Sequence, residues 1–389
     1  MNIMNLLTRR SLLKTAAAGV ALRCSAGAAP GARIEAITTI SQRPEFYHGW
    51  PTVARRANGE LLMVCSGGRE SHVCPFGWVE MMRSKDDGRS WSWPEVLMDS
   101  AIDDRDAGVC ETAKGSILVT TFTSTAYQPI LDRAEAASSS SESAWPAGKL
   151  ARWRAANSRI GKAERESLLG CWMIRSADGG LTWSAPFRVP VNSPHGPITL
   201  SDGRVFYAGK QLWERDHRNG VAESTDDGQS WRWLAEIPTR PGDNAAQYHE
   251  LHAVEASDKR LIVQIRNHNQ ANSGETLQCE SSDRGKTWTT PHSIGVWGLP
   301  SHLLRLKDGR LLMTYGHRRK PYGNQARISE DHGRNWSEPI LISQEGAGGD
   351  LGYPSTAQLG DGSLVSVWYE KLAESPRAVL RQARWSLAS

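Results

Sequence analysis

The segment SSDRGKTW, residues 281–288, occurs in five similar copies along this chain. Each copy follows the pattern S-x-D-x-G-x-[STN]-W, and we call each copy a box. Within a box, the aspartate can accept backbone N–H bonds, the glycine can adopt positive φ, and the tryptophan can pack the turn against a neighbour. The pattern is therefore typical of a rigid β-hairpin corner. The boxes begin at Ser84, Ser176, Ser224, Ser281 and Ser329.

The spacing of the boxes indicates a repeated β-sheet unit. Their starts lie 92, 48, 57 and 48 residues apart, and all intervals but the first are typical of propeller blades. A second repeat, a short turn followed by an apolar strand, begins at Ala57, Ala113, Ser201, Ser257, Lys307 and Gly360. Six such turns predict an all-β, six-bladed propeller with five boxes. The sixth blade has no box, and we expect N-terminal residues to close it.

The first 32 residues differ in character from the rest. Residues 8–22, TRRSLLKTAAAGVAL, join the pair Arg9 and Arg10 to an apolar run that is too short to span a bilayer. We interpret residues 1–32 as a twin-arginine export signal, which predicts a periplasmic or secreted protein without stable membrane insertion. Residues 33–389 are then expected to form one propeller domain.

Composition limits the function classes. A net charge of +4 is too small to indicate nucleic-acid binding. Of the six cysteines, Cys24 lies in the export segment, and the others contain no C-x-x-C pair, which argues against a disulfide framework or a zinc site. We therefore expect no metal and no cofactor, and nothing in the composition indicates an oligomeric state.

Residues 126–169 account for the wide first interval. They are rich in serine and alanine at first and then become compatible with helix. The predicted topology places both ends of this blade-two insertion on the face opposite the boxes. A lid over a site and a decoration on the outer edge of the blade are both open interpretations.

Topology also predicts where side chains converge. If the turns and the boxes share one face, the starts of the inner strands and the ends of the second strands share the other face. A single polar residue at a strand end is usually solvated or locally paired, but several that are costly to bury favour an anionic ligand. The residues at these positions are Trp50, Asp106, Glu250, Tyr353, His48, His195, His302, Arg69, Arg266, Arg318, Arg319 and Glu370.

Together, the boxes and two longer segments resemble the bacterial sialidase (neuraminidase) superfamily, a family of six-bladed propellers with Asp-boxes. Residues 250–266, ELHAVEASDKRLIVQIR, resemble a segment in which a glutamate begins one strand and an arginine ends the next. Residues 352–370, GYPSTAQLGDGSLVSVWYE, resemble the segment with the nucleophilic tyrosine and a later glutamate. The resemblance covers the chain after the export segment, although boxes also occur in propellers without hydrolytic activity.

The resemblance implies a role for individual residues. Tyr353 would be the nucleophile and Glu250 the base that accepts its proton, because a neutral phenol needs such a partner. Arg266 and either Arg318 or Arg319 would bind the carboxylate of an acidic terminal sugar. Glu370 would hold an arginine in place. The implied partner is thus a glycan with an acidic terminal sugar.

Blade one departs from the family pattern. Residues 48–53, HGWPTV, place Gly49 or Trp50 where the family has a clamp arginine, although Arg69 resembles the family arginine after the second strand. The acid/base aspartate expected before the first box is missing, and His72, Glu70 or Glu80 stands in that region instead.

Three functions therefore remain open. The first is a sialidase-type retaining exo-glycosidase in which His72 or Glu70 acts as the acid/base. The second is a glycoside hydrolase or polysaccharide lyase of the same fold, which uses its histidine-rich rim on another acidic sugar. The third is a carbohydrate-binding propeller without turnover. The retained Tyr353 and Glu250 favour catalysis, whereas the missing clamp arginine favours the second function over a strict sialidase.

Overall fold

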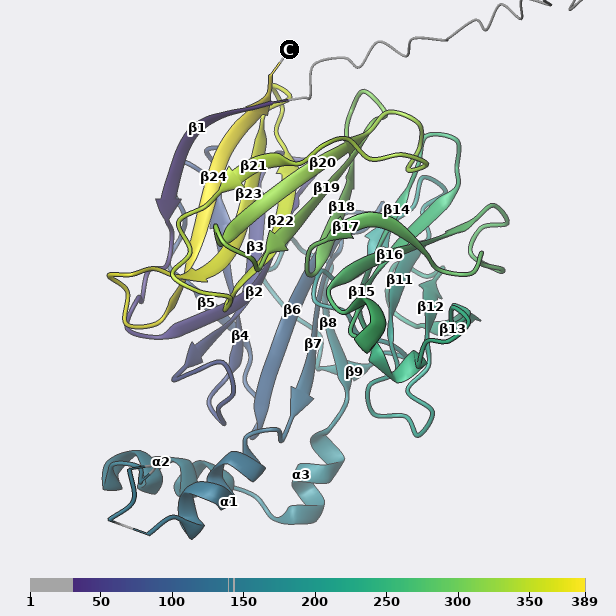
Figure 1. The fold of residues 1–389 in the computed structure, drawn as a ribbon. Helices are drawn as coiled ribbons and strands as arrows, with labels where there is room; N and C mark the ends of the chain where they lie inside the picture. The colour runs from purple at the N-terminus through teal and green to yellow at the C-terminus, as the bar shows by residue number, and fades with distance from the viewer. Residues whose placement is uncertain (1–30, 139, 143, 389) are drawn as a thin grey trace, which may run out of the picture.

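Six four-stranded antiparallel sheets make up the fold (Figure 1). The computed structural model describes residues 31–138, 140–142 and 144–388. Inner strands of successive sheets contact one another in a closed cycle, so the sheets are the blades of a six-bladed propeller. The predicted propeller is confirmed, and its side-chain core lies between neighbouring blades, as in the cluster that joins blades one and six.

In blades one to five the strands run from the axis outward in chain order, and in blade six β1 follows β24 as the outer strand. Blades one to three consist of β2 (Tyr47–Arg55), β3 (Leu61–Arg69), β4 (Trp78–Ser84), β5 (Glu95–Met98); β6 (Asp103–Glu111), β7 (Ile117–Ser124), β8 (Cys171–Ser176), β9 (Phe187–Arg188); and β10 (Ile198–Thr199), β11 (Val205–Lys210), β12 (Asn219–Ser224), β13 (Arg232–Glu236). Blades four to six consist of β14 (Tyr248–Glu255), β15 (Leu261–Asn267), β16 (Glu275–Ser281), β17 (His292–Trp297); β18 (Ser301–Arg305), β19 (Leu311–His317), β20 (Gly323–Ser329), β21 (Ile340–Ser343); and β22 (Leu351–Gln358), β23 (Leu364–Lys371), β24 (Ala378–Leu387), β1 (Ala32–Thr39). Two 3₁₀ turns, η1 (Ala245–Gln247) and η2 (Gln270–Asn272), flank the inner strands of blade four.

Strand β1 closes the ring. It pairs antiparallel with β24, from Ala32 opposite Leu387 to Thr39 opposite Arg381, and so supplies the outer strand of blade six. The expected closure by N-terminal residues is confirmed. The predicted export signal lies outside the described residues except for its last two positions, the second of which already begins β1.

Each box is a hydrogen-bonded turn between the third and fourth strands of its blade. In the blade-four box, Asp283 Oδ1 accepts from Ser281 Oγ at 2.8 Å and from the Thr287 backbone N–H at 2.9 Å, while Thr287 Oγ1 donates to Asp283 Oδ2 at 2.6 Å. These bonds, chiefly that from the Thr287 hydroxyl, lower the pKa of Asp283 to about 2. The same bonds recur around Asp86, Asp178, Asp226 and Asp331.

Tryptophans of the boxes tie each turn to the preceding blade. Trp91 Nε1 of blade one donates to Gln382 Oε1 of blade six at 2.9 Å, and Trp336 Nε1 of blade five donates to Gln278 Oε1 of blade four at 3.0 Å. The Trp288 ring of blade four packs 6.2 Å from Phe206 of blade three. A box therefore both closes its hairpin and connects neighbouring blades.

The insertion predicted in blade two follows the second strand of that blade and contains three helices. They are α1 (Gln128–Ala136), α2 (Ala147–Asn157) and α3 (Lys162–Leu168), and they lie beyond the strand ends opposite the boxes (Figure 1). Trp153 Nε1 and Arg152 Nη2 donate to Glu70 at 3.0 and 2.7 Å, which anchors α2 to the loop after β3. Among the described residues, no helix combines the length and apolar character needed to cross a membrane.

Replacing Asp226 by alanine should lower the free energy of unfolding by about 1–3 kcal/mol, because Ser224 and the Ser230 side chain and backbone lose their acceptor. Urea denaturation followed by tryptophan fluorescence measures this loss. Asp216→Ala, at an exposed loop position, is the matched control and should be nearly neutral. Equal stability losses in the two variants would contradict the role assigned to the box aspartate.

Candidate functional site

Left-handed backbone turns direct three inner-strand side chains toward one mouth of the propeller. Trp50, Asp106 and Tyr353 have φ angles of 54°, 48° and 53°, and at each of them the register with the second strand shifts. Positive φ is unfavourable for residues with a Cβ, so each turn must be held by its surroundings. In blade four, the register between the inner strand and the second strand shifts beside Glu250, at the position that corresponds to the other three shifts. The Trp50 and Tyr353 rings lie 6.4 Å apart.

Tyr353, Glu250 and Arg266 form one hydrogen-bonded group at this mouth. Tyr353 Oη donates to Glu250 Oε1 at 2.6 Å. Arg266 Nη1 donates to Tyr353 Oη at 2.9 Å and lies 2.7 Å from Glu250 Oε2. Arg266 Nε also lies 2.6 Å from Nε2 of His268. The side chains of Glu250 and Arg266 are only slightly exposed, so the group is largely shielded from water.

Electrostatics fixes the protonation state of this group. Burial and the neighbouring Glu250 charge raise the pKa of Tyr353 well above 10. Burial alone would raise the pKa of Glu250, but the charge of Arg266 and the Tyr353 hydrogen bond lower it overall. At neutral pH the pair is therefore a phenol bonded to a carboxylate. The carboxylate is placed to accept the phenol proton.

The structure distinguishes Arg318 from Arg319. Arg318 Nε donates to the Leu351 carbonyl at 2.9 Å, and its guanidinium lies 5.7 Å from the Tyr353 ring centre. Its buried Nη2 has no hydrogen-bond partner among the described residues. Arg319 is exposed and lies over Trp297 instead. Arg318 therefore offers a free donor beside Tyr353, and Arg319 does not.

Asp106 adds a buried carboxyl group on the blade-two side of the site. Its Oδ1 has no hydrogen-bond partner in the described part of the chain. Burial raises the pKa of Asp106 to about 7, and the charge of Glu250 adds to that effect. A carboxyl group of this kind can donate or accept a hydrogen bond near neutral pH.

The expectation that Arg69 binds substrate is corrected by the structure. Its guanidinium is fully buried and makes two bonds to Asp103, at 2.6 and 2.8 Å. Trp50 covers it, with the ring centre 4.9 Å from Arg69 and 4.4 Å from Arg105. Arg69 is therefore a structural cation beneath Trp50, because Asp103 neutralises its charge and both Nη1 and Nη2 are hydrogen-bonded within the protein.

His48 and Glu370 also lie apart from the site. His48 is buried, with Nε2 3.3 Å from Glu80 Oε1, so it is not part of the rim. Glu370 is fully buried, and the cation beside it is Arg381 of β24, at 3.5 Å. The predicted role of Glu370 in holding a site arginine is corrected, since Arg381 belongs to the packing of blade six.

His72 and Glu70 occupy different settings. Glu70 bonds Arg152 and Trp153 of the insertion, so it acts as the anchor of α2. His72 is half exposed, and its ring meets Trp50 edge-on with centroids 5.0 Å apart. Of these two acid/base candidates, the structure therefore brings only His72 to the wall of the site.

His195 and His302 lie behind Tyr353 on the propeller axis, not on the rim. Their rings lie 5.0 Å apart, and the His252 ring stacks on His302 at 4.5 Å. The three line an axial cavity of about 420 Å³ that leads toward the turn face. Burial lowers the pKa of all three, that of His302 to about 3, so they are neutral. No group of His, Cys, Asp or Glu in the described residues has the arrangement of a metal site.

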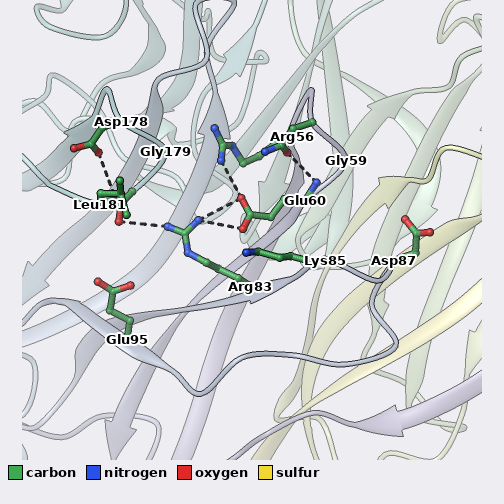
Figure 2. A pocket seen from close by; sticks show the side chains of 12 residues that line it. Arg56, Gly59, Glu60, Arg83, Lys85, Asp87, Glu95, Asp178, Gly179 and Leu181 are labelled. Atoms are coloured by element: carbon green, nitrogen blue, oxygen red, sulfur yellow. Dashed lines mark hydrogen bonds and ion pairs between the residues drawn. The ribbon is translucent and has the colours of Figure 1, made fainter.

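A groove of about 870 Å³ lies on the turn face between blades one and two (Figure 2). Within blade one, Glu60 accepts from Arg56 at 2.9 Å and from Arg83 at 3.3 Å. Arg56 Nε also donates to Glu111 of blade two at 2.9 Å, which connects the two blades. The residues that line this groove do not include Tyr353 or Glu250.

Four side chains at the mouth were missed by reasoning from the sequence. Asp350 lies 3.0 Å from His72 Nδ1 and accepts from Tyr47 and Tyr369. His268 contacts Arg266. Each lies within a few residues of a predicted site position, so their place at strand ends was the signal available.

Comparison with known proteins agrees with this architecture. The model of a BNR repeat-like domain matches residues 143–366, which is more than half of the chain. A sialidase from Bacteroides fragilis is 26% identical over 225 residues, covering 51% of this chain and 39% of that protein. A sialidase from Micromonospora viridifaciens is 25% identical over 204 residues, covering 44% and 31%. The matches thus span well under half the length of these relatives.

A solved structure supports the fold over nearly the whole chain. A protein of unknown function from Dyadobacter fermentans superposes with a TM-score of 0.74 at 21% identity, covering 92% of this chain and all of that one. At such identity the likeness shows the fold alone. From the matched repeat and the two relatives, we conclude that the chain belongs to the BNR repeat-like domain family and is a distant homologue of bacterial sialidases.

Proposed function

We propose that this chain is a retaining exo-glycosidase of sialidase type, which hydrolyses terminal sialic acid or a related acidic sugar. The observation that carries the proposal is the 2.6 Å hydrogen bond from the Tyr353 phenol to Glu250, with Arg266 bound to both. A neutral phenol suits an anionic sugar, because a carboxylate nucleophile would be repelled by the substrate's own charge.

The proposed reaction begins at the phenol. Glu250 accepts the Tyr353 proton as Tyr353 Oη bonds to the anomeric carbon, and the glycosidic C–O bond breaks. The N–H of Arg266 already points to Tyr353 Oη and stabilises the negative charge that develops there. In the second half, water attacks the anomeric carbon, the bond from that carbon to Tyr353 Oη breaks, and Tyr353 recovers its proton from Glu250. The water gives up one proton, which balances the proton taken up by the departing oxygen.

Arg318 is the proposed anchor of the sugar carboxylate. Its unpartnered Nη2 lies beside the Tyr353 ring, whereas Arg266 is largely engaged by Glu250 and Tyr353. Asp106, with its free Oδ1, is the proposed partner of a sugar hydroxyl. The site thus provides one free cationic donor and one buried carboxyl group.

Two further assignments belong to the same proposal. The five boxes correspond to the Asp-boxes of sialidases, on the strength of their shared hydrogen bonds. The proposed export signal in residues 1–32 makes the enzyme periplasmic or secreted, where it would meet glycans with an acidic terminal sugar.

A second candidate is a hydrolase or lyase of this fold that acts on a different acidic sugar. Trp50 favours it, because this ring covers Arg69 at a position where a sialidase would present a clamp arginine. A screen of aryl glycosides of sialic acid and of uronic acids, with products identified by NMR, separates the candidates. Unsaturated products would indicate a lyase.

Tyr353→Phe and Glu250→Gln should each lower kcat by at least about 100-fold, because each removes one half of the nucleophile pair. Initial rates on an aryl sialoside measure the effect, and circular dichroism verifies the fold. Tyr315→Phe, which removes a buried phenol hydroxyl bonded to Gln325 in blade five, is the matched control. Near-normal activity in both site variants would overturn the assignment.

Arg266→Gln should move the acid limb of kcat/KM to higher pH. Activity needs ionised Glu250, and Arg266 lowers the Glu250 pKa, so losing that cation raises the pKa and shifts the limb upward. Arg318→Gln should instead raise KM about 10–100-fold and leave the limb in place. The pH profiles of the two variants, measured side by side, test the roles of Arg266 and Arg318. An acid limb that does not move in Arg266→Gln would contradict the effect of Arg266 on Glu250.

A further inference from the structure

We propose that His72, oriented by Asp350, is the general acid and base of this site and that the natural leaving group is an unactivated alcohol, such as a sugar hydroxyl. The inference rests on the proposed glycosidase function. It extends that function, because nothing in the nucleophile pair supplies the proton that an alkoxide leaving group requires.

The His72 ring is held by a carboxylate from the opposite end of the chain. His72 Nδ1 lies 3.0 Å from Asp350 Oδ1 and 2.9 Å from the Tyr47 hydroxyl. Asp350 also accepts from the Tyr47 and Tyr369 hydroxyls, at 3.0 and 3.1 Å. With Nδ1 engaged in this way, Nε2 is the nitrogen available to a ligand.

The position of His72 suits a departing group. Its ring meets Trp50 edge-on at 88°, and Trp50 in turn meets the Tyr353 ring at 73°, so both rings border one tryptophan. The His72 side chain is 47% exposed, whereas Tyr353 is buried. A substrate whose anomeric carbon lies at Tyr353 would leave toward this more open side.

The other acidic candidates on this side of the site are either engaged or buried. Glu70 bonds Arg152 and Trp153 of the insertion. Glu80 is buried and bonds Trp78 and His48. Asp106 is buried beside Glu250. His72 is therefore the titratable group at this wall that combines solvent access with an orienting carboxylate.

The proposed step balances protons and electrons. His72 starts as the imidazolium, with Nδ1–H donating to Asp350 and Nε2–H donating to the glycosidic oxygen. The Nε2 proton passes to that oxygen as the C–O bond breaks and the bond to Tyr353 Oη forms. Neutral His72 then removes a proton from the water that attacks the anomeric carbon, which restores the imidazolium.

Charges of both signs surround the dyad. Arg69 and Arg105 both donate to the His72 carbonyl, at 3.0 and 3.1 Å, and Arg377 donates to the carbonyl of Glu70. Asp350 faces the imidazole and opposes these cations. Burial would raise the pKa of Asp350, but hydrogen bonds from His72, Tyr47 and Tyr369 lower it overall.

The test compares two substrates with different leaving groups. On a methyl α-glycoside of sialic acid, His72→Asn should lower kcat/KM by about 10²–10⁴-fold, because the alcohol needs a proton. On the 4-nitrophenyl glycoside the loss should be much smaller, and added azide should restore turnover by replacing water as nucleophile. His292→Asn is the matched control: His292 is 48% exposed and paired with Glu280 at 3.0 Å, but lies on the turn face.

Asp350→Asn tests the orienting role. Loss of the carboxylate removes the acceptor that orients the His72 ring, so kcat on the methyl glycoside should fall while KM stays nearly unchanged. The loss should be much smaller on the 4-nitrophenyl glycoside. A purely structural role for Asp350 would instead lower activity on both substrates equally.

The outcomes separate this inference from the proposed function. Equal losses of activity on both substrates in His72→Asn would overturn the role proposed for His72 and Asp350. A loss confined to the methyl glycoside that occurs in Asp106→Asn and not in His72→Asn would overturn it too. In either case, an active parent enzyme and an inactive Tyr353→Phe would still support the glycosidase function. A parent chain that cleaves neither sialoside would overturn the proposed function and the dyad with it.

Discussion

Left-handed backbone at the inner strands is the constraint on which the site depends. A regular strand would alternate its side chains across the blade, and none would point along the axis toward the mouth. The shifts at Trp50, Asp106 and Tyr353 break that alternation at the same level in three blades. Because bulges add twist and redirect a side chain, repeated copies of one unit can place different residues at one centre.

The arginines near the ends of the second strands differ in how far the protein neutralises their charge. Arg69 forms a two-bond ion pair with Asp103 and is covered by Trp50. Arg266 is paired with Glu250 and also donates to Tyr353, whereas Arg318 has no carboxylate partner among the described ion pairs and its Nη2 has no hydrogen-bond partner in that part of the chain. A buried cation without a counter-charge is unfavourable unless a ligand supplies one. This difference is why Arg318 is the proposed anchor of the sugar carboxylate.

The repeats were sufficient to predict the fold. Boxes and turns specify local hydrogen bonds, and their number and spacing specify the blades, so the closure of blade six followed from topology. Side-chain partners were harder to predict. Arg69 matches a family position, but its pairing with Asp103 depends on the path of the next blade, and Glu370 is paired with Arg381 for the same reason. The contact of His72 with Asp350 joins residues 278 positions apart, a pairing that no local pattern encodes.

The pairing of β1 with β24 has a consequence for biogenesis. Leu380 N–H donates to Ser41 Oγ, 339 residues away, so this joint can form only after the chain has been made through residue 380. Contacts of such long range are slow to form, and strand edges that await partners are open to pairing with other chains. During synthesis β1 must therefore remain without its partner strand until β24 has been made.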